Sequence, residues 1–102
     1  FMRYVVIVRG RLKPATDAAA EAAHQALFDK LSSKARSLGN TGHLPLRGAQ
    51  DPGEFVVIDV WESLDGLRAV MEDPSMADDL ASVYAEPPDV SVWEDPGWAS
   101  YL

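Results

Sequence analysis

The 102-residue sequence contains no cysteine, little positive charge in its second half and no long apolar run. The lack of cysteine excludes disulfides, thiolate metal sites and cysteine nucleophiles, and it is typical of a reducing compartment. No apolar run approaches the roughly 18 residues of a membrane span, and no charged and then apolar leader precedes the first expected strand. We therefore expect a cytoplasmic protein with one domain over residues 2–102. Phe1 stands before Met2 and is interpreted as a remnant of cloning.

Basic residues are concentrated in the first half of the chain. Residues 1–51 carry a net charge of +4 and residues 52–102 a net charge of −11, which together give −7. Phosphate binding needs a clustered basic surface, so we expect no nucleic-acid partner. The acidic excess serves solubility in its simplest interpretation. Alternatively, the two halves attract each other, within one chain or across a dimer.

Motifs for cofactors and for the common hydrolases are also missing. The sequence contains no phosphate-binding glycine loop, no HExxH, no GxSxG and no calcium loop. Its two histidines, His24 and His43, lack the i,i+4 spacing of a helical metal site. We therefore expect no bound cofactor and no metal.

Hydrophobic periodicity predicts an α+β protein. The expected strands are residues 2–12, 41–49, 55–61 and 89–94, and the expected helical segments are residues 18–38, 64–71 and 75–85. The last segment is expected to start with a capping box formed by Ser75 and Asp78. The order β-α-β-β-α-β predicts a ferredoxin-like fold, in which helices cover one face of a four-stranded antiparallel sheet. Because the first and third strands are apolar on both faces, we expect the uncovered face to pack against a second copy in a homodimer.

Asp59 is the most informative single residue of the sequence. It lies within an apolar expected strand, where an unpaired carboxylate would cost several kcal/mol. Its candidate partners are His24, on the apolar stripe of the first helix, and His43 or Arg47 on the neighbouring strand. A histidine held by a carboxylate beside a pocket is a candidate general base. The alternatives are a structural ion pair or an aspartate that reaches solvent.

Aromatic side chains form a second candidate group. Core packing is the simpler interpretation of this group, and a flat apolar slot for a planar ligand is the alternative. In the alternative, Trp98 closes the slot or contacts the other protomer. The candidate substrate-binding residues are then Trp61, Phe28, Tyr84, Trp93 and Arg47.

Three short motifs carry a family resemblance. Val60-Trp-Glu-Ser63, then Leu64-Asp-Gly-Leu67 and Asp73-Pro74, resemble the antibiotic-biosynthesis-monooxygenase-like (ABM-like) group of the dimeric α+β barrel superfamily. The layout matches over essentially the whole chain. The resemblance implies a dimeric α+β barrel, with a pocket between the sheet and the helices of each protomer and Trp61 in that pocket.

The same resemblance points to two kinds of chemistry. Cofactor-free oxygenases of this group carry an asparagine four residues before the tryptophan, and Val57 holds that position here. Haem-degrading relatives carry a histidine about ten residues after the tryptophan, where this chain has Met71.

The preferred hypothesis is a small-molecule enzyme resembling the cofactor-independent monooxygenases, with an aromatic or polyketide-like substrate. Asp59 and a histidine would move protons, so that an acidic substrate forms a carbanion that reacts with oxygen. Two other hypotheses stay open. One is a non-catalytic, stress-related dimer that binds an apolar ligand, and the other is an isomerase or cyclase on the same scaffold, which needs no oxygen.

Overall fold

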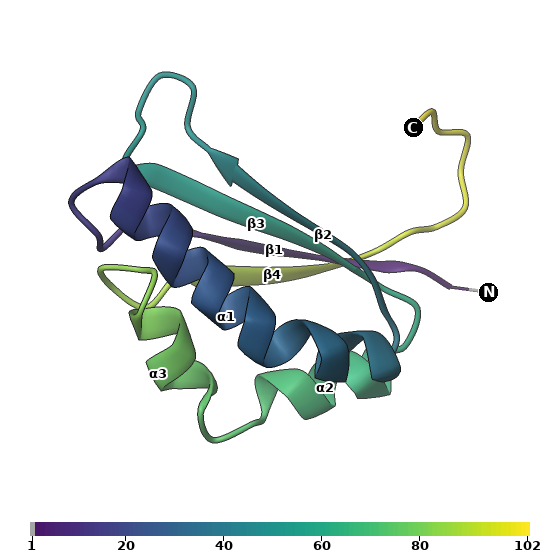
Figure 1. The fold of residues 1–102 in the computed structure, drawn as a ribbon. Coiled ribbons are helices and arrows are strands. Elements are labelled where there is room, and N and C mark those ends of the chain that lie inside the picture. The colour runs from purple at the N-terminus through teal and green to yellow at the C-terminus, as the bar shows by residue number, and fades with distance from the viewer. Residues whose placement is uncertain (1) are drawn as a thin grey trace.

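The computed structural model describes residues 2–102, so the interpretation of Phe1 lies outside the described residues. Three helices lie on one face of an antiparallel sheet with strand order β2-β3-β1-β4 (Figure 1). This is the α+β, ferredoxin-like arrangement predicted from the sequence. The elements in chain order are β1 (Tyr4–Arg11), α1 (Asp17–Ser37), β2 (Asn40–Arg47), β3 (Glu54–Trp61), α2 (Leu64–Met71), α3 (Met76–Ala81) and β4 (Asp89–Glu94).

The two longer helices begin at side-chain caps. The hydroxyl of Thr16 accepts a hydrogen bond from the N–H of Ala19 at 3.2 Å, and the hydroxyl of Ser63 accepts one from the N–H of Gly66 at 3.0 Å. Such caps satisfy N–H groups that have no partner within the helix. After α1, Gly39 adopts a φ of +108°, a conformation that favours glycine. The chain reverses there, so that β2 returns along α1.

The start of α3 differs from the prediction. Ser75 makes no side-chain capping bond, so the expected capping box with Asp78 is absent. The Ser75 hydroxyl instead lies 2.9 Å from a carboxylate oxygen of Asp73 and 3.0 Å from one of Asp79. Asp73 also accepts a hydrogen bond from the N–H of Ser75 at 2.9 Å. The hydroxyl of Ser75 is thus engaged by two carboxylates and does not cap the helix. The helix is also shorter than expected, because Tyr84 forms an isolated β-bridge with another segment.

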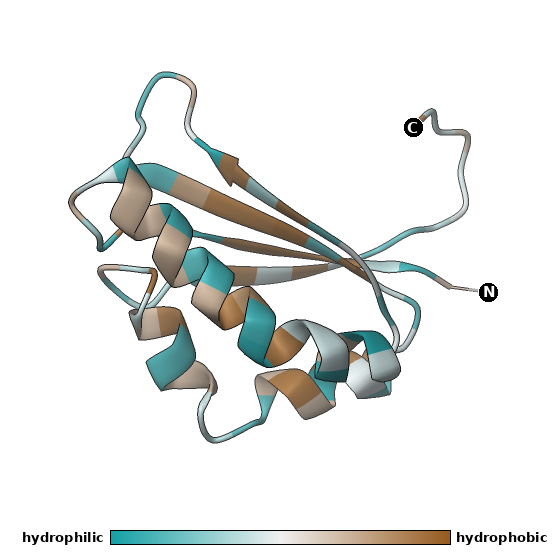
Figure 2. Cartoon of the chain, in the orientation of Figure 1, coloured by the Kyte–Doolittle hydropathy of each residue, from teal (hydrophilic) through white to brown (hydrophobic). Residues whose placement is uncertain are grey.

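Strand alternation divides the sheet into two faces. The face toward the helices holds the core, and its central side chains are only 2–8% exposed. They belong to Val6, Val8, Phe55, Val57 and Trp61. Apolar residues follow one another along the central strands (Figure 2), so the opposite face, which we call the outer face, is also largely apolar. By the strand register it carries Val5, Ile7, Leu44, Leu46, Val56, Ile58, Val60 and Trp93.

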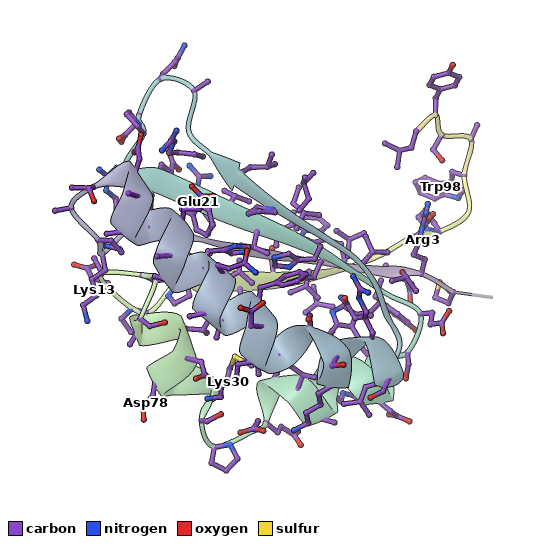
Figure 3. The ribbon with its side chains drawn as sticks, in the orientation of Figure 1. Arg3, Lys13, Glu21, Lys30, Asp78 and Trp98 are labelled. Carbon is purple, nitrogen blue, oxygen red and sulfur yellow. The ribbon has the colours of Figure 1, made fainter. Side chains whose placement is uncertain are left out.

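The charge asymmetry of the sequence reappears as ion pairs. Among residues 2–102, four pairs join a basic residue of the first half to an acidic residue of the second half. Lys30 is one of the basic partners and extends from α1 beside α3 (Figure 3). Because these basic side chains are largely exposed, water screens the pairs and each contributes little to stability. The four pairs are Arg3–Asp95, Arg9–Glu54, Lys30–Asp79 and Lys34–Asp73.

The lengths of the helices and the path of the C-terminal tail complete the description of the fold. Among residues 2–102, no helix combines the length and the apolar character needed to cross a membrane. After β4, residues 95–102 leave the sheet as an extended tail that carries Trp98 (Figures 1 and 3).

Candidate active site

A cavity of about 560 Å³ lies between the sheet and the helices. Its floor consists of side chains of β1 and β3, and its other walls come from the three helices and the first half of β2. Most of the lining side chains are apolar. The volume falls within the range of roughly 300–1,000 Å³ that small-molecule sites occupy. The cavity lies where the family resemblance implied a pocket.

Three polar side chains meet on the cavity wall, and we call them the triad: His24, His43 and Asp59. A carboxylate oxygen of Asp59 lies 2.6 Å from Nδ1 of His43, and Nε2 of His43 lies 2.9 Å from Nε2 of His24. The side chains of His43 and Asp59 are 27% and 23% exposed. The structure therefore brings Asp59 together with both of the histidines that the sequence offered as its candidate partners.

Sheet register and the chain reversal after α1 bring the triad together. His43 of β2 lies directly opposite Asp59 of β3, and both project toward α1. Because β2 runs back along α1, His43 also meets His24 of that helix. Of the candidate partners of Asp59, His43 is the one that bonds to it. Arg47 instead donates a hydrogen bond to Asp17 at 2.6 Å.

The hydrogen bonds define one proton arrangement for an ionised Asp59 and two neutral imidazoles. The carboxylate only accepts, so Nδ1 of His43 carries a proton and Nε2 of His43 must accept. Nε2 of His24 is then the donor, and Nδ1 of His24 is left without a proton. The two imidazole centroids are 5.2 Å apart with planes inclined by 16°, so the rings meet edge to edge along the N···N contact.

Electrostatics keep His24 in its neutral form. Burial lowers the pKa of His24, the neighbouring His43 lowers it further, and Asp59 acts weakly in the opposite direction. The rings of Phe28 and Phe55 flank it, with centroid distances of 6.2 and 6.3 Å. A neutral imidazole beside an apolar cavity is able to accept a proton from a bound molecule.

Three of the aromatic candidates line the cavity. Trp61 and Phe28 contribute apolar surface to its wall. Tyr84 donates a hydrogen bond to the carbonyl of Val8 at 3.1 Å, and its ring packs against Phe55. Burial raises the pKa of Tyr84, so its phenol stays protonated. Tyr84 therefore serves as a fixed wall residue in this geometry.

The other two candidates for substrate contact lie outside the cavity. Trp93 is paired with Val5 in the sheet and projects from the outer face, where it is 58% exposed. Arg47 lies at the end of β2 and is engaged by Asp17. The expectation that these two side chains line the pocket is therefore corrected. Trp98 lies on the tail away from the helices and does not close the cavity (Figure 3).

The sequence interpretation missed a polar part of the cavity wall. Ser32 and Arg36 of α1 line the cavity together with Asn40 and Thr41 of β2. Arg36 falls outside the apolar stripe of α1, so it has the pattern of a solvent-facing residue. The sequence did hold one signal for this part of the wall. Ser32 and Arg36 are four residues apart near the C-terminal end of α1, so they lie on the same side of the helix.

Within residues 2–102, histidine and acidic side chains form no group of three that would hold a metal ion. In the triad, the two facing nitrogens of His24 and His43 are directed at each other. Their hydrogen bond occupies the positions that a shared metal would need.

Comparisons with known proteins define the class of fold. No protein-family model matches the chain, and no curated protein matches it. Solved structures do match. A proposed antibiotic biosynthesis monooxygenase from Nitrosomonas europaea is 24% identical with a TM-score of 0.69, over 96% of this chain and 94% of that one.

Two further structures have the same arrangement. Rv0793 from Mycobacterium tuberculosis is 24% identical with a TM-score of 0.65, over 96% of this chain and 99% of its own. SnoaB, a cofactor-independent oxygenase from Streptomyces nogalater, is 14% identical with a TM-score of 0.63, over 98% and 97% of the two chains. The chain thus has the ferredoxin-like fold of ABM structures, as the sequence motifs had indicated.

Proposed function

We propose that this chain belongs to the ABM-like group and is a cofactor-independent oxygenase that acts on an aromatic or polyketide-like substrate. The observation that carries the proposal is the triad, which places a neutral imidazole at the wall of an apolar cavity. Further support comes from the shared fold with SnoaB, itself a cofactor-independent oxygenase. A proton acceptor in an apolar site is what an acidic substrate needs in order to form a carbanion.

The triad divides the work of proton transfer. Nδ1 of His24 takes a proton from an acidic C–H or O–H group of the substrate. The positive charge that results is shared with His43 through the N···N hydrogen bond of 2.9 Å. Asp59 stabilises that charge and holds the His43 tautomer through its 2.6 Å bond to Nδ1. His24 is therefore the proposed base, and His43 and Asp59 are positioning residues.

Molecular oxygen is the oxidant in the proposed reaction. The carbanion of a CH₂ group donates an electron pair to oxygen, and a carbon–oxygen bond forms. The peroxide accepts a proton and becomes a hydroperoxide. Loss of the second proton from the carbon then breaks the O–O bond, which yields a ketone and one water molecule. All four electrons come from the substrate carbon, and apolar walls protect the carbanion from water.

The triad would take the role of the asparagine side chain that the cofactor-free oxygenases of the resembling group carry. Val57 stands where the cofactor-free oxygenases have an asparagine, and it contributes only apolar surface to the cavity. Asp59 lies two residues further along β3 on the same face. The proposed proton acceptor is therefore His24 of α1, supported by His43 of β2, and the asparagine position of β3 takes no part in proton transfer.

A direct test uses anthrone, a tricyclic ketone with an acidic CH₂ group. We expect the protein to consume oxygen with anthrone and to produce the corresponding quinone. His24→Gln should lower the rate by about 10²–10⁴-fold, the usual contribution of a positioned base, and Asp59→Asn and His43→Gln should lower the rate by a smaller factor, because they only position that base. Asp17→Asn is the matched control, since its exposed carboxylate pairs with Arg47 away from the cavity.

Oxygen uptake and quinone absorbance are the measurements. The proposal fails if the pure protein consumes no oxygen with anthrone or with a panel of hydroxylated aromatics and quinols. It also fails if Asp59→Asn changes only the thermal stability.

The apolar cavity itself favours one other function, a non-catalytic protein that holds an apolar metabolite. That function predicts quenching of Trp61 fluorescence by ligands without turnover, because Trp61 lies in the cavity wall. An isomerase or cyclase would use the triad but consume no oxygen. The dependence of product formation on oxygen separates these possibilities.

We also propose that the working unit is a homodimer joined through the outer faces of two sheets. The support is the apolar character of that face, where Leu44, Leu46 and Trp93 are exposed in the single chain. Apolar patches of this kind mark interaction surfaces.

A further inference from the structure

We propose that Asn40 is a positioning residue of the triad, because its carboxamide holds a one-residue bulge in β2 that turns His43 toward Asp59. This inference rests on the proposed function and assigns a part in its proton transfer to a residue outside the triad. It follows from the register between β2 and β3, from the cavity lining and from the hydrogen bonds of the Asn40 side chain.

The ladder between β2 and β3 is irregular near the start of β2. Asn40 lies opposite Trp61. Two residues further along β2, Gly42 lies opposite Val60, which is only one residue away from Trp61 on β3. Thr41 is therefore an extra residue in the ladder, and we call the segment 40–42 the bulge.

The start of β2 is fixed independently of the bulge. The N–H of Glu62 donates to the carbonyl of Gly39 at 2.9 Å, and Gly39 is the residue at which the chain reverses after α1. The first residues of β2 therefore cannot slide along β3 to absorb the extra residue.

The extra residue decides which face of the sheet His43 occupies. If the ladder continued regularly from Asn40, His43 would lie opposite Ile58, whose side chain belongs to the outer face. With the bulge, His43 lies opposite Asp59 on the face toward the helices. A shift of one residue in register thus separates a histidine in the cavity from a histidine on the outer face.

The cavity lining shows the same break in alternation. Neighbouring side chains of a regular strand lie on opposite faces of the sheet. Asn40 and Thr41 are neighbours, yet both line the cavity. This lining is what an inserted residue produces.

The carboxamide of Asn40 bridges the bulge. Its nitrogen donates to the carbonyl of Gly42 on the same strand and to the carbonyl of Val60 on β3, each at 3.1 Å. The first bond spans the extra residue, and the second ties the bulged strand to its neighbour. The hydroxyl of Thr41 lies 3.4 Å from the carbonyl of Val60 and adds only a weak contact.

The bulge needs such a support because β2 is an edge strand with a ladder on one side only. A bulge disrupts that ladder locally, and an unpaired carbonyl shielded from water costs free energy. The strands also approach closely here, since a methyl group on Gly42 would lie 3.3 Å from Cβ of Val60. Without the Asn40 amide, a rearranged ladder competes with the bulge.

Direct contact with substrate is the competing explanation for Asn40. A carboxamide nitrogen carries two hydrogens, and in Asn40 both are donated to backbone carbonyls. Its effect on the chemistry is therefore exerted through His43, whose bonds to Asp59 and His24 both require the imidazole on the helix side.

NMR of ¹⁵N-labelled protein tests the positioning role without any substrate. In the wild type we expect His43 in its Nδ1–H tautomer, and we expect both amide protons of Asn40 to be protected from exchange with water. Asn40→Ala should let His43 exchange between tautomers, so that its Nδ1–H signal is lost. Asn40→Ser keeps one donor and should lose part of that signal.

Ala69→Gly is the matched control for a general loss of stability. Ala69 is an exposed residue of α2 that does not line the cavity, and glycine there weakens the helix without touching the sheet. Ala69→Gly should leave the His43 signal unchanged. The wild-type measurement on Asn40 does not depend on the folding of any variant.

A double-mutant cycle links the bulge to the proposed reaction with anthrone. Asn40→Ala should lower kcat about 10-fold and change KM less, since misplacing a group by about 1 Å costs up to about 100-fold in rate. In a His43→Gln background the same substitution should have no further effect on kcat, because Asn40 acts through His43.

The inference is overturned if the Asn40 amide protons of the wild type exchange freely, if Asn40→Ala leaves the His43 tautomer intact, or if Ala69→Gly also removes the signal. An equal loss of kcat in both backgrounds would instead assign Asn40 to substrate contact. Failure of the proposed function differs from these outcomes. A tautomer response without oxygen uptake would support the positioning role and refute the oxygenase, and oxygen uptake without a tautomer response would do the opposite.

Discussion

At the scale of single residues, the chemistry of the cavity depends on the proton that His24 does not carry. Burial among aromatic rings and the proximity of His43 both disfavour the charged imidazole, so the pKa of His24 lies below its ordinary value of 6.5. A base must be unprotonated before it can act. The same environment that stabilises the neutral ring therefore makes it available at neutral pH.

This lowered pKa has a measurable effect on stability. In the unfolded chain His24 binds a proton near pH 6.5, and in the folded chain only at lower pH. With respect to this group, the free energy of unfolding should therefore have its full value above about pH 6.5. It should fall as the pH decreases toward the pKa of His24 in the folded chain. We expect His24→Gln to lose less stability than the wild type between about pH 8 and pH 5.5. Urea unfolding at both pH values measures the difference, and parallel losses would contradict it.

At the scale of elements, α2 is placed by a close contact with the end of α1. Gly66, in the first turn of α2, lies against the backbone carbonyl of Leu38. A methyl group on Gly66 would overlap that carbonyl oxygen. The contact brings α2 over the sheet, where Leu67 packs into the core and lines the cavity.

Gly66→Ala tests this contact. Helix propensity alone predicts that Gly66→Ala stabilises the chain by about 1 kcal/mol and that Ala69→Gly, at an exposed site of the same helix, destabilises it by as much. The contact with Leu38 instead predicts that Gly66→Ala loses about 1–3 kcal/mol through overpacking. Both variants would then be less stable than the wild type. Urea denaturation gives the two free energies. A more stable Gly66→Ala protein would show that the helices are not in close contact.

At the scale of the whole molecule, the sheet has helices on one face only. Its outer face presents valine, isoleucine and leucine side chains from β1, β2 and β3, together with Trp93 of β4. The edge strand β2 contributes the exposed Leu44 and Leu46 to this face. The proposed homodimer would remove these side chains from water by packing two such faces together.

Two substitutions with matched exposure test the dimer. Leu44 and Val92 are each 52% exposed, but Leu44 lies on the outer face and Val92 lies opposite Val6 on the face toward the helices. Leu44→Glu should convert the dimer into a monomer, because it would bury a charge between the sheets. Val92→Glu should leave the dimer intact. Light scattering after size exclusion gives the mass, and a monomeric wild type would refute the proposal.

Local chemistry in the sequence predicted most of the fold. The apolar runs of the strands and the apolar stripe of the first helix each depend on neighbouring residues only. The position of β2 at the sheet edge agrees with Pro45, which has no N–H to donate to a further strand. The ferredoxin-like order then followed from counting elements. These features could be predicted because their causes lie within a few residues.

The site was only partly predictable, for a physical reason. The sequence indicated that Asp59 needs a partner, and only the register between β2 and β3 decided that His43, and not Arg47, bonds to it. The reversal after α1 placed His24 of that helix beside His43 of β2. Register and helix packing arise from contacts between residues far apart in the chain, so no local pattern records them. The sequence determined which groups are available, and the tertiary structure decided which of them meet.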